Sequence, residues 1–530
     1  FQNMFLKKEI DIKDFPILIG IILYAYIINW LSGNIGIIPI DSFGFLDTGN
    51  SILNNKLPIR DFWIFTGLIV DYMEAFFLFF FGNNWNSHLA HASFMNILAT
   101  LSLYYFLKEM GLKKKFVIFY SICFATLCYP VSGTPFAYIH SYIFSIMAIF
   151  ALTIAIKNKN KFLWFIFPFL CFFSFLSMQT PAAYILLILI VVLTNYFLKY
   201  RDIKNLQFFL LGSILSTLLF LLFFYITKTP FTNFLYQYIL FPLTIGEGRL
   251  SSNELAYVGL LDQMNFKRFI GEFKFIHIFL APLIIITTMN IKKNKGPINT
   301  INFTIIFSTL AFFFNQLITA NQIYIFSLIP ILASVLHFNL INSKYNPKII
   351  FAIICVVLFA TIKFHHRFNI ERKFHDLEGI DKSRAINANL IHKNLNNLKW
   401  INKFDQDPYY ETQVIKQAIE IISKDKREKS LITHYQFIST VLNENLNIFN
   451  RWYLWDNNTH PTENHIYFDF YKSMVNKNIK KNKIEVIYLL GQENEIVFNK
   501  VRNYFTDLCF ESKTIVRKRF SVHEIINCKK

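Results

Sequence analysis

The chain has 530 residues, 54% of them hydrophobic and only 16% charged, and its formal net charge is +19. Long apolar runs recur from Phe15 to about Phe364. A soluble protein of this length could not bury so many consecutive apolar helices, so the runs predict a polytopic all-α membrane domain. Because lysine and arginine gather in the cytoplasmic loops of membrane proteins, the positive charge does not point to a nucleic-acid partner.

The first span, from Phe15, follows Lys7, Lys8 and Lys13, which places the N-terminus in the cytoplasm. The span is long enough to cross and lacks a small-residue cleavage site, so we expect no cleavable signal peptide. The segment after it, from Pro39 to Trp63, is then the first exterior loop.

The next apolar run, Phe62 to Gly82, contains Asp71 and Glu74 near its middle. Each acid would cost ~2.5–3.5 kcal/mol at the centre of a spanning helix. The two acids are three residues apart and share one helical face. We therefore predict an interfacial amphipathic helix in the first exterior loop, with both acids on its solvated face.

If this run does not span, the basic clusters alternate cleanly with apolar segments and all fall on the cytoplasmic side. The result is about eleven transmembrane helices, with the C-terminus outside. The basic clusters lie at 108–115, 157–161, 199–204, 292–295 and 344–348.

Composition changes near residue 366, where polar residues become frequent and no long apolar run follows. This predicts a transmembrane domain over 1–365 and a small C-terminal soluble α/β or α+β domain over 366–530. Cys509 and Cys528 are the only cysteines in the second domain, and the sequence leaves their pairing open. A helix is expected at 413–422 and strands at 430–433, 447–454, 484–490 and 520–526.

No P-loop, Gly-x-Gly-x-x-Gly motif or zinc-type spacing of Cys and His occurs, so nothing indicates a nucleotide-driven pump. The first exterior loop has a more informative order. Asp41 opens it, a turn follows at Asn55, then the cluster Pro58-Ile59-Arg60-Asp61-Phe62, and the apolar helix closes on Phe80-Phe81-Gly82.

This order resembles the GT-C superfamily of integral membrane glycosyltransferases, particularly bacterial relatives of protein O-mannosyltransferases and of the aminoarabinose lipid A transferase. The resemblance covers the order of elements over about 1–365, and its sequence-level match is confined to about 41–82. Such relatives often carry a second acid at the outer end of the fourth span, where this chain has His140.

The resemblance implies an inverting glycosyltransferase in the bacterial inner membrane, with a GT-C-like fold and a periplasmic C-terminal domain. The implied donor is a polyprenyl-phosphate sugar held among membrane lipids. The acceptor, whether glycan, lipid or protein, stays open. So does the use of a divalent metal or other cofactor.

Sugar transfer to a hydroxyl needs a base, for which Asp41 is the first candidate. The alternative is that Asp41 caps a helix. Asp47 is a second candidate carboxylate or a solvated loop residue. Arg60 contacts the donor phosphate, or pairs with Asp61 to orient the loop.

Further candidates for substrate binding are Arg249, Lys267 and Arg268 in the long outer loop. The alternative is that these side chains only place their charges among the lipid headgroups. His140 is either a site residue or an interfacial one. The aromatic segment 451–461 binds an acceptor or forms a strand edge.

Two rival classes stay open. One is a transporter or flippase of lipid-linked sugars, although no internal repeat is evident. The other is a non-catalytic envelope assembly protein whose exterior domain binds a partner.

Overall fold

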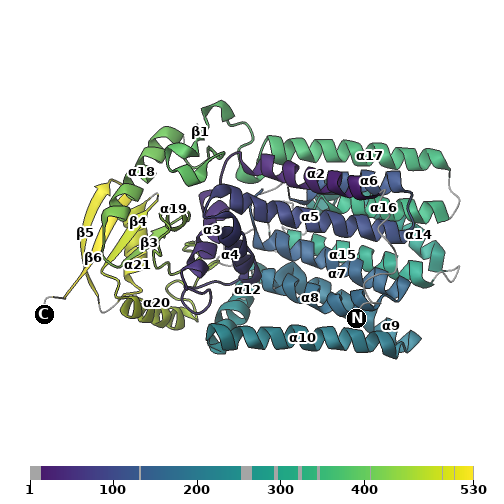
Figure 1. Cartoon of the computed structure of the whole chain (residues 1–530), viewed down its shortest axis with the longest axis horizontal. Coiled ribbons are helices and arrows are strands. Elements are labelled where there is room, and N and C mark those ends of the chain that lie inside the picture. Colours follow the sequence, from purple (N-terminus) through teal and green to yellow (C-terminus); the bar gives the residue numbers. More distant parts are fainter. Residues whose placement is uncertain are drawn as a thin grey trace.

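The structure is a computed structural model that describes residues 14–129, 133–251, 266–291, 296–319, 325–342, 346–405, 407–491, 493–505 and 508–528. A bundle of long helices occupies one side of the molecule, and a region built around a small sheet occupies the other (Figure 1). Two shorter helices, α3 (Pro39–Leu53) and α4 (Leu68–Phe81), lie between them.

Seven described helices are long and apolar enough to cross a membrane, which indicates a membrane-embedded protein. They are α2 (Phe15–Gly33), α7 (Ala137–Asn158), α9 (Gln179–Tyr200), α10 (Ile203–Thr227) and the segments Phe273–Ile291, Ile298–Thr319 and Pro347–His375. The long helices are α2 (Phe15–Gly33), α5 (Trp85–Met110), α6 (Lys114–Cys128), α7 (Ala137–Asn158), α8 (Lys161–Ser177), α9 (Gln179–Tyr200), α10 (Ile203–Thr227), α14 (Phe266–Ile291), α15 (Gly296–Thr319), α16 (Leu328–Asn342) and α17 (Pro347–His365). The short α11 (Phe231–Phe234), a π-helical turn (Leu235–Leu240) and α12 (Phe241–Ser251) follow α10.

Contacts at the helix ends give the bundle its direction. Asp14, just before α2, forms ion pairs with Lys108 at 2.8 Å and Lys114 at 2.6 Å. At the other end of α2, Trp85 Nε1 donates to Asn34 Oδ1 at 3.1 Å. The backbone of Lys399, in the C-terminal region, then pairs with the residues after α2. The basic ends of α5 and α6 therefore lie at the end of the bundle away from the sheet.

The sheet has four strands in the order β3-β4-β6-β5. β3 (Lys429–Thr433) pairs with β4 (Val486–Leu490) in parallel, and the antiparallel pairs β4–β6 (Phe520–Ile526) and β6–β5 (Cys509–Val516) complete it. Thr433 is in register with Leu490, so the parallel strands end together at one edge. Smaller elements are β1 (Ile386–Asn387), β2 (Lys399–Trp400), α18 (Pro408–Lys424), α19 (Ile438–Leu442), α20 (Phe468–Asn482) and α21 (Asn494–Arg502).

The predicted helix at 413–422 and the strands near 430–433, 484–490 and 520–526 are confirmed. The predicted strand at 447–454 is wrong. The segment joins no sheet, and its backbone pairs with the first exterior loop: Trp63 N donates to Phe449 O at 2.7 Å, and Arg451 N to Trp63 O at 3.2 Å. The missed strand β5 is an exposed edge strand, whose charged residues hide the alternation that reveals buried strands.

The bundle side and the sheet side share a hydrophobic core. Phe43 of α3 packs on Trp400 and Phe437, with ring centroids 5.8 Å and 4.8 Å apart, and on Trp85 of α5. The division at residue 366 stays a prediction, but α3 and the loop after it belong as much to the C-terminal core as to the bundle.

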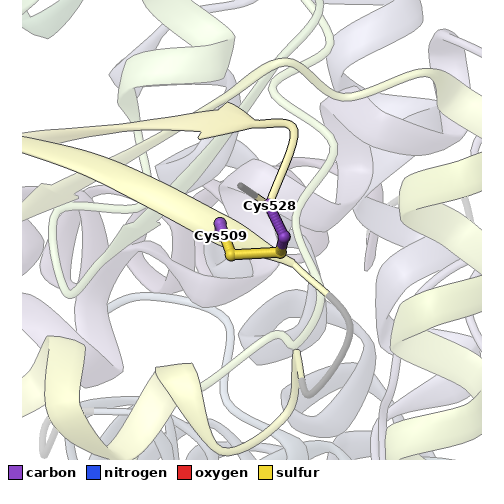
Figure 2. The surroundings of a disulfide bond; sticks show 2 residues. All are labelled: Cys509 and Cys528. Atoms are coloured by element: carbon purple, nitrogen blue, oxygen red, sulfur yellow. A yellow bond between two sulfur atoms is a disulfide. The ribbon is translucent and has the colours of Figure 1, made fainter. Parts of the chain in front are cut away.

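Cys509 and Cys528 form a disulfide with Cα atoms 5.1 Å apart (Figure 2), which settles the pairing that the sequence left open. The bond joins the start of β5 to the segment after β6 and closes this end of the sheet.

Candidate functional site

Asp41 lies in the first turn of α3, where the positive end of the helix dipole stabilises a negative charge. Pro39 begins this helix after the extended residue Ile38, as proline often does. The cap is made by another residue, since Ser42 Oγ accepts from Ile38 N at 3.0 Å. Asp41 makes no capping hydrogen bond, so the helix start does not depend on it.

The carboxyl group of Asp41 is half-buried, and none of the described residues forms a hydrogen bond or ion pair with it. Burial raises its pKa to about 6. At neutral pH such a group is mostly ionised and still has an appreciable affinity for a proton, which are the two properties of a general base.

A cavity of about 270 Å³ adjoins this helix turn. Pro39 and Ile40 form part of its wall, and the carboxyl ends of β3 and β4 form another part. The structure thus places the residues just before Asp41 against a cavity in the C-terminal region, which the sequence could not indicate.

Asp47 is six residues from Asp41, about 240° around the helix, so the two carboxylates face different ways. Asp47 is almost fully buried and accepts a hydrogen bond from Ser439 of α19. Burial raises its pKa to about 7, against the opposing effect of that hydrogen bond. These contacts favour an anchoring role between α3 and α19, and not the solvated position considered from the sequence.

Arg60 and Asp61 form an ion pair at 2.6 Å. Arg60 also donates to the backbone oxygens of Thr227 and Asn55, both at 2.9 Å. Lys481 of α20 contacts Asp61 at 3.0 Å. Burial opposes ionisation of Asp61, but the hydrogen bonds from Arg60, Leu57 N and Lys481 lower its pKa. This arrangement favours the pairing interpretation, since Arg60 is fully engaged in holding the loop.

The prediction that Asp71 and Glu74 face solvent is wrong, because both side chains are fully buried. Asp71 pairs with Arg451 and accepts from Thr48 Oγ1 at 2.5 Å. The opposite side of α4 exposes Phe79 (70%) and Phe80 (62%). The helix is amphipathic, as expected, but its acids point into the protein and its phenylalanines point outward. The two buried acids bind partners from α3, from α5 and from the C-terminal region, which explains why they point into the protein.

Glu74 binds two histidines of α5, accepting from His88 Nδ1 at 2.8 Å and from His91 Nδ1 at 2.7 Å. Burial opposes its ionisation, but His88 and His91 lower the pKa of Glu74 to about 2. His88 Nε2 also donates to Ser42 O at 3.0 Å. Both ring nitrogens of His88 therefore have partners, Glu74 on one side and the backbone of α3 on the other. This contact fixes the helix turn that carries Asp41.

His140 extends the same chain of contacts. Its Nε2 lies 3.0 Å from His91 Nε2, and its Nδ1 lies 2.9 Å from the hydroxyl of Tyr129. The same Nδ1 also lies 3.0 Å from Phe136 O, so the ring of His140 is held between His91, Tyr129 and the backbone of its own helix. His140 is fully buried, so the interfacial alternative is wrong. The pair of acids in an apolar run, with two histidines three residues apart soon after, was the sequence signal for this network.

The remaining candidates lie elsewhere. Lys267 is exposed and Arg268 is half-buried in the first turn of α14. Arg249 belongs to α12, but its side chain lies outside the described residues. In segment 451–461, Arg451 is the buried partner of Asp71, while Tyr453 and Trp455 line the cavity beside α3.

Across the described part of the chain, no group of three or more His, Cys, Asp or Glu side chains is arranged to hold a metal ion. No protein-family model matches this sequence, and no curated protein is significantly similar to it.

Proposed function

We propose that the chain is an inverting membrane glycosyltransferase that moves a sugar from a polyprenyl-phosphate donor to an acceptor hydroxyl. One observation carries the proposal: the carboxyl group of Asp41 has no partner among the described residues, and the two residues just before it, Pro39 and Ile40, line a cavity at the ends of β3 and β4. A structural aspartate at such a junction would be expected to bind a neighbour, as Asp47 and Asp71 do.

In this reaction the oxygen of the acceptor hydroxyl attacks the anomeric carbon of the donor sugar. The carboxylate of Asp41 takes the proton that this hydroxyl loses. The bond from that carbon to the donor phosphate breaks at the same time, and the configuration inverts. The leaving lipid phosphate needs positive charge near the membrane surface but no strong acid. Because Arg60 already pairs with Asp61, we propose Lys267, which is exposed in the first turn of α14, as the candidate for this contact.

We further propose the membrane arrangement that the charges favour. The seven long apolar helices together with α5, α6, α8 and α16 make eleven spans. The basic helix ends that contact Asp14 are cytoplasmic, and the region after α17 is periplasmic. The disulfide supports this orientation, because such bonds persist in oxidising compartments.

The test is transfer of radiolabelled sugar from synthetic polyprenyl-phosphate donors by the full chain in proteoliposomes, with extracts of bacterial envelope as acceptor. Asp41→Asn should reduce transfer by roughly 10²–10⁴-fold, the usual contribution of a general base. The matched control is Asp469→Asn on the exposed side of α20, which should transfer normally. Equal transfer by wild type and Asp41→Asn would remove Asp41 as the base. Movement of the lipid-linked sugar across the vesicle without transfer would instead favour a flippase.

A further inference from the structure

The cavity beside α3 lies where ligands commonly bind in sheets with parallel strands. Ile432 to Tyr435 run past the end of β3, and Leu489 to Gly491 run past the end of β4. The strands are parallel and end in register, so their carboxyl ends open a crevice at one sheet edge. With a volume of about 270 Å³, the cavity is at the small end of the range for ligand sites and suits a single compact group.

The backbone at this edge leaves room for a ligand. Gly491 directly follows β4 with φ +153°, a conformation that side chains rarely adopt, and a Cβ built there meets no atom within 4 Å. The wall of the cavity is therefore open at this residue, and a larger side chain would reduce the space.

The lining is aromatic and uncharged. Tyr453 and Trp455 come from the segment after Arg451, and no Asp, Glu, Lys or Arg is among the described lining residues. Burial lowers the pKa of His434, so its ring is neutral at physiological pH. The Trp455 ring is held by His460 and Tyr504, with ring centroids 5.1 Å and 6.1 Å away. A phosphate or carboxylate would find no countercharge among these described residues. An uncharged molecule with an apolar face and hydroxyl groups would find aromatic surface together with the polar groups of Thr433 and His434.

We infer that this cavity binds one neutral pyranose unit of the acceptor saccharide, against Trp455 and Tyr453. The inference rests on the proposed function for its assignment to the acceptor. Pro39 and Ile40 belong to the cavity wall, and Asp41 is the next residue of the same helix turn. A sugar seated there lies against the helix turn that carries the candidate base, whereas the lipid donor approaches from the membrane.

Binding can be measured without any transfer, by saturation-transfer-difference NMR on the full chain in nanodiscs. The probes are the methyl glycosides of glucose, galactose, mannose and N-acetylglucosamine. We expect at least one to bind wild type, and Trp455→Leu and Gly491→Val each to weaken that binding roughly tenfold. Tyr409→Leu, on an exposed residue of α18 outside the cavity, is the matched control and should bind as wild type does.

Two results would overturn the inference. The first is no saturation transfer to any of the four glycosides, or transfer that is equal in wild type and both cavity variants. The second is displacement of the bound glycoside by a short-chain polyprenyl-phosphate sugar, which would make the cavity a subsite for the donor. If glycosides bind as expected but no sugar is transferred in the proteoliposome assay, the result counts against the proposed function and leaves the binding site standing.

Discussion

Arg451 of the C-terminal region and Asp71 of α4 form an ion pair with both side chains at most 1% exposed, although 380 positions separate them in the sequence. Arg451 also donates to Thr66 O, and its guanidinium lies 4.4 Å from the centre of the Phe45 ring. The pair therefore ties α3, α4 and the C-terminal region together at the place where the candidate base lies.

Removal of one partner of this ion pair should be costly. Arg451→Met leaves Asp71 buried without a countercharge, which we expect to lower the free energy of unfolding by about 3–5 kcal/mol. The double variant Asp71→Leu with Arg451→Met should recover much of the loss, because it buries no charge. Thermal and denaturant unfolding in detergent would measure both. Lys373→Ala breaks the exposed pair with Glu378, and because water screens that pair the loss of stability should be far smaller. Similar losses in Arg451→Met and Lys373→Ala would show that the buried pair contributes nothing special.

Asp47 should make stability depend on pH. Its pKa is about 7 in the folded protein, raised by burial from an ordinary value of 3.8. Between these values the folded state binds more protons than the unfolded state, so stability falls as pH rises from about 4 to about 7. The loss amounts to at most about 4 kcal/mol, at about 1.4 kcal/mol for each tenfold change in proton affinity.

In Asp47→Asn the amide oxygen still accepts from Ser439 and no carboxyl titrates. We expect this variant to lose part of the pH dependence and to be more stable than wild type near pH 8. Unfolding curves at several pH values would test this. If the free energy of unfolding depends on pH equally in both proteins, Asp47 is not the group responsible.

The pH profile of transfer should report Asp41. Its pKa is about 6, and the base acts as the carboxylate. Transfer efficiency, kcat/KM, should therefore rise with pH and level off above about 7. The acid limb should be absent from the residual activity of Asp41→Asn. A limb that persists in this variant would assign the titration to another group.

The disulfide should stabilise the sheet region. It links residues 19 positions apart, and closing a loop of this size in the unfolded chain corresponds to about 3 kcal/mol. The double variant Cys509→Ser with Cys528→Ser should unfold at a correspondingly lower denaturant concentration. Cys355→Ser, at an exposed free cysteine, serves as the control and should behave as wild type. Mass spectrometry before and after reduction would verify the bond, and free thiols at Cys509 and Cys528 in the purified native chain would refute it.

The exposed phenylalanines of α4 should contact lipid. A nitroxide at Phe80→Cys, in a Cys355→Ser background and in nanodiscs, should be more accessible to oxygen than to a water-soluble nickel complex. A nitroxide at Tyr409→Cys, on the exposed surface of α18, should show the reverse preference. If the Phe80 position behaves like the Tyr409 position, α4 does not lie at the membrane.

The sequence located the loop but not its internal contacts. The acids of α4 lie on one helical face, as their spacing predicts, and the helix is amphipathic. Periodicity identifies a polar face, however, without saying whether water or protein covers it. Here Arg451, His88 and His91 cover it, and Arg451 comes from a segment that is distant in the chain.

By itself, the sequence determined the long apolar helices, three of the four strands of the C-terminal sheet and the turn at Asn55, whose φ of +59° fits the asparagine there. These features follow from local composition and periodicity. Only the tertiary structure decided that Asp47 is an anchor, that Lys481 contacts Asp61, and that Ile40 meets the end of β3 across a cavity. These relations join residues hundreds of positions apart, and they depend on how the helices and the sheet pack, which no local pattern encodes.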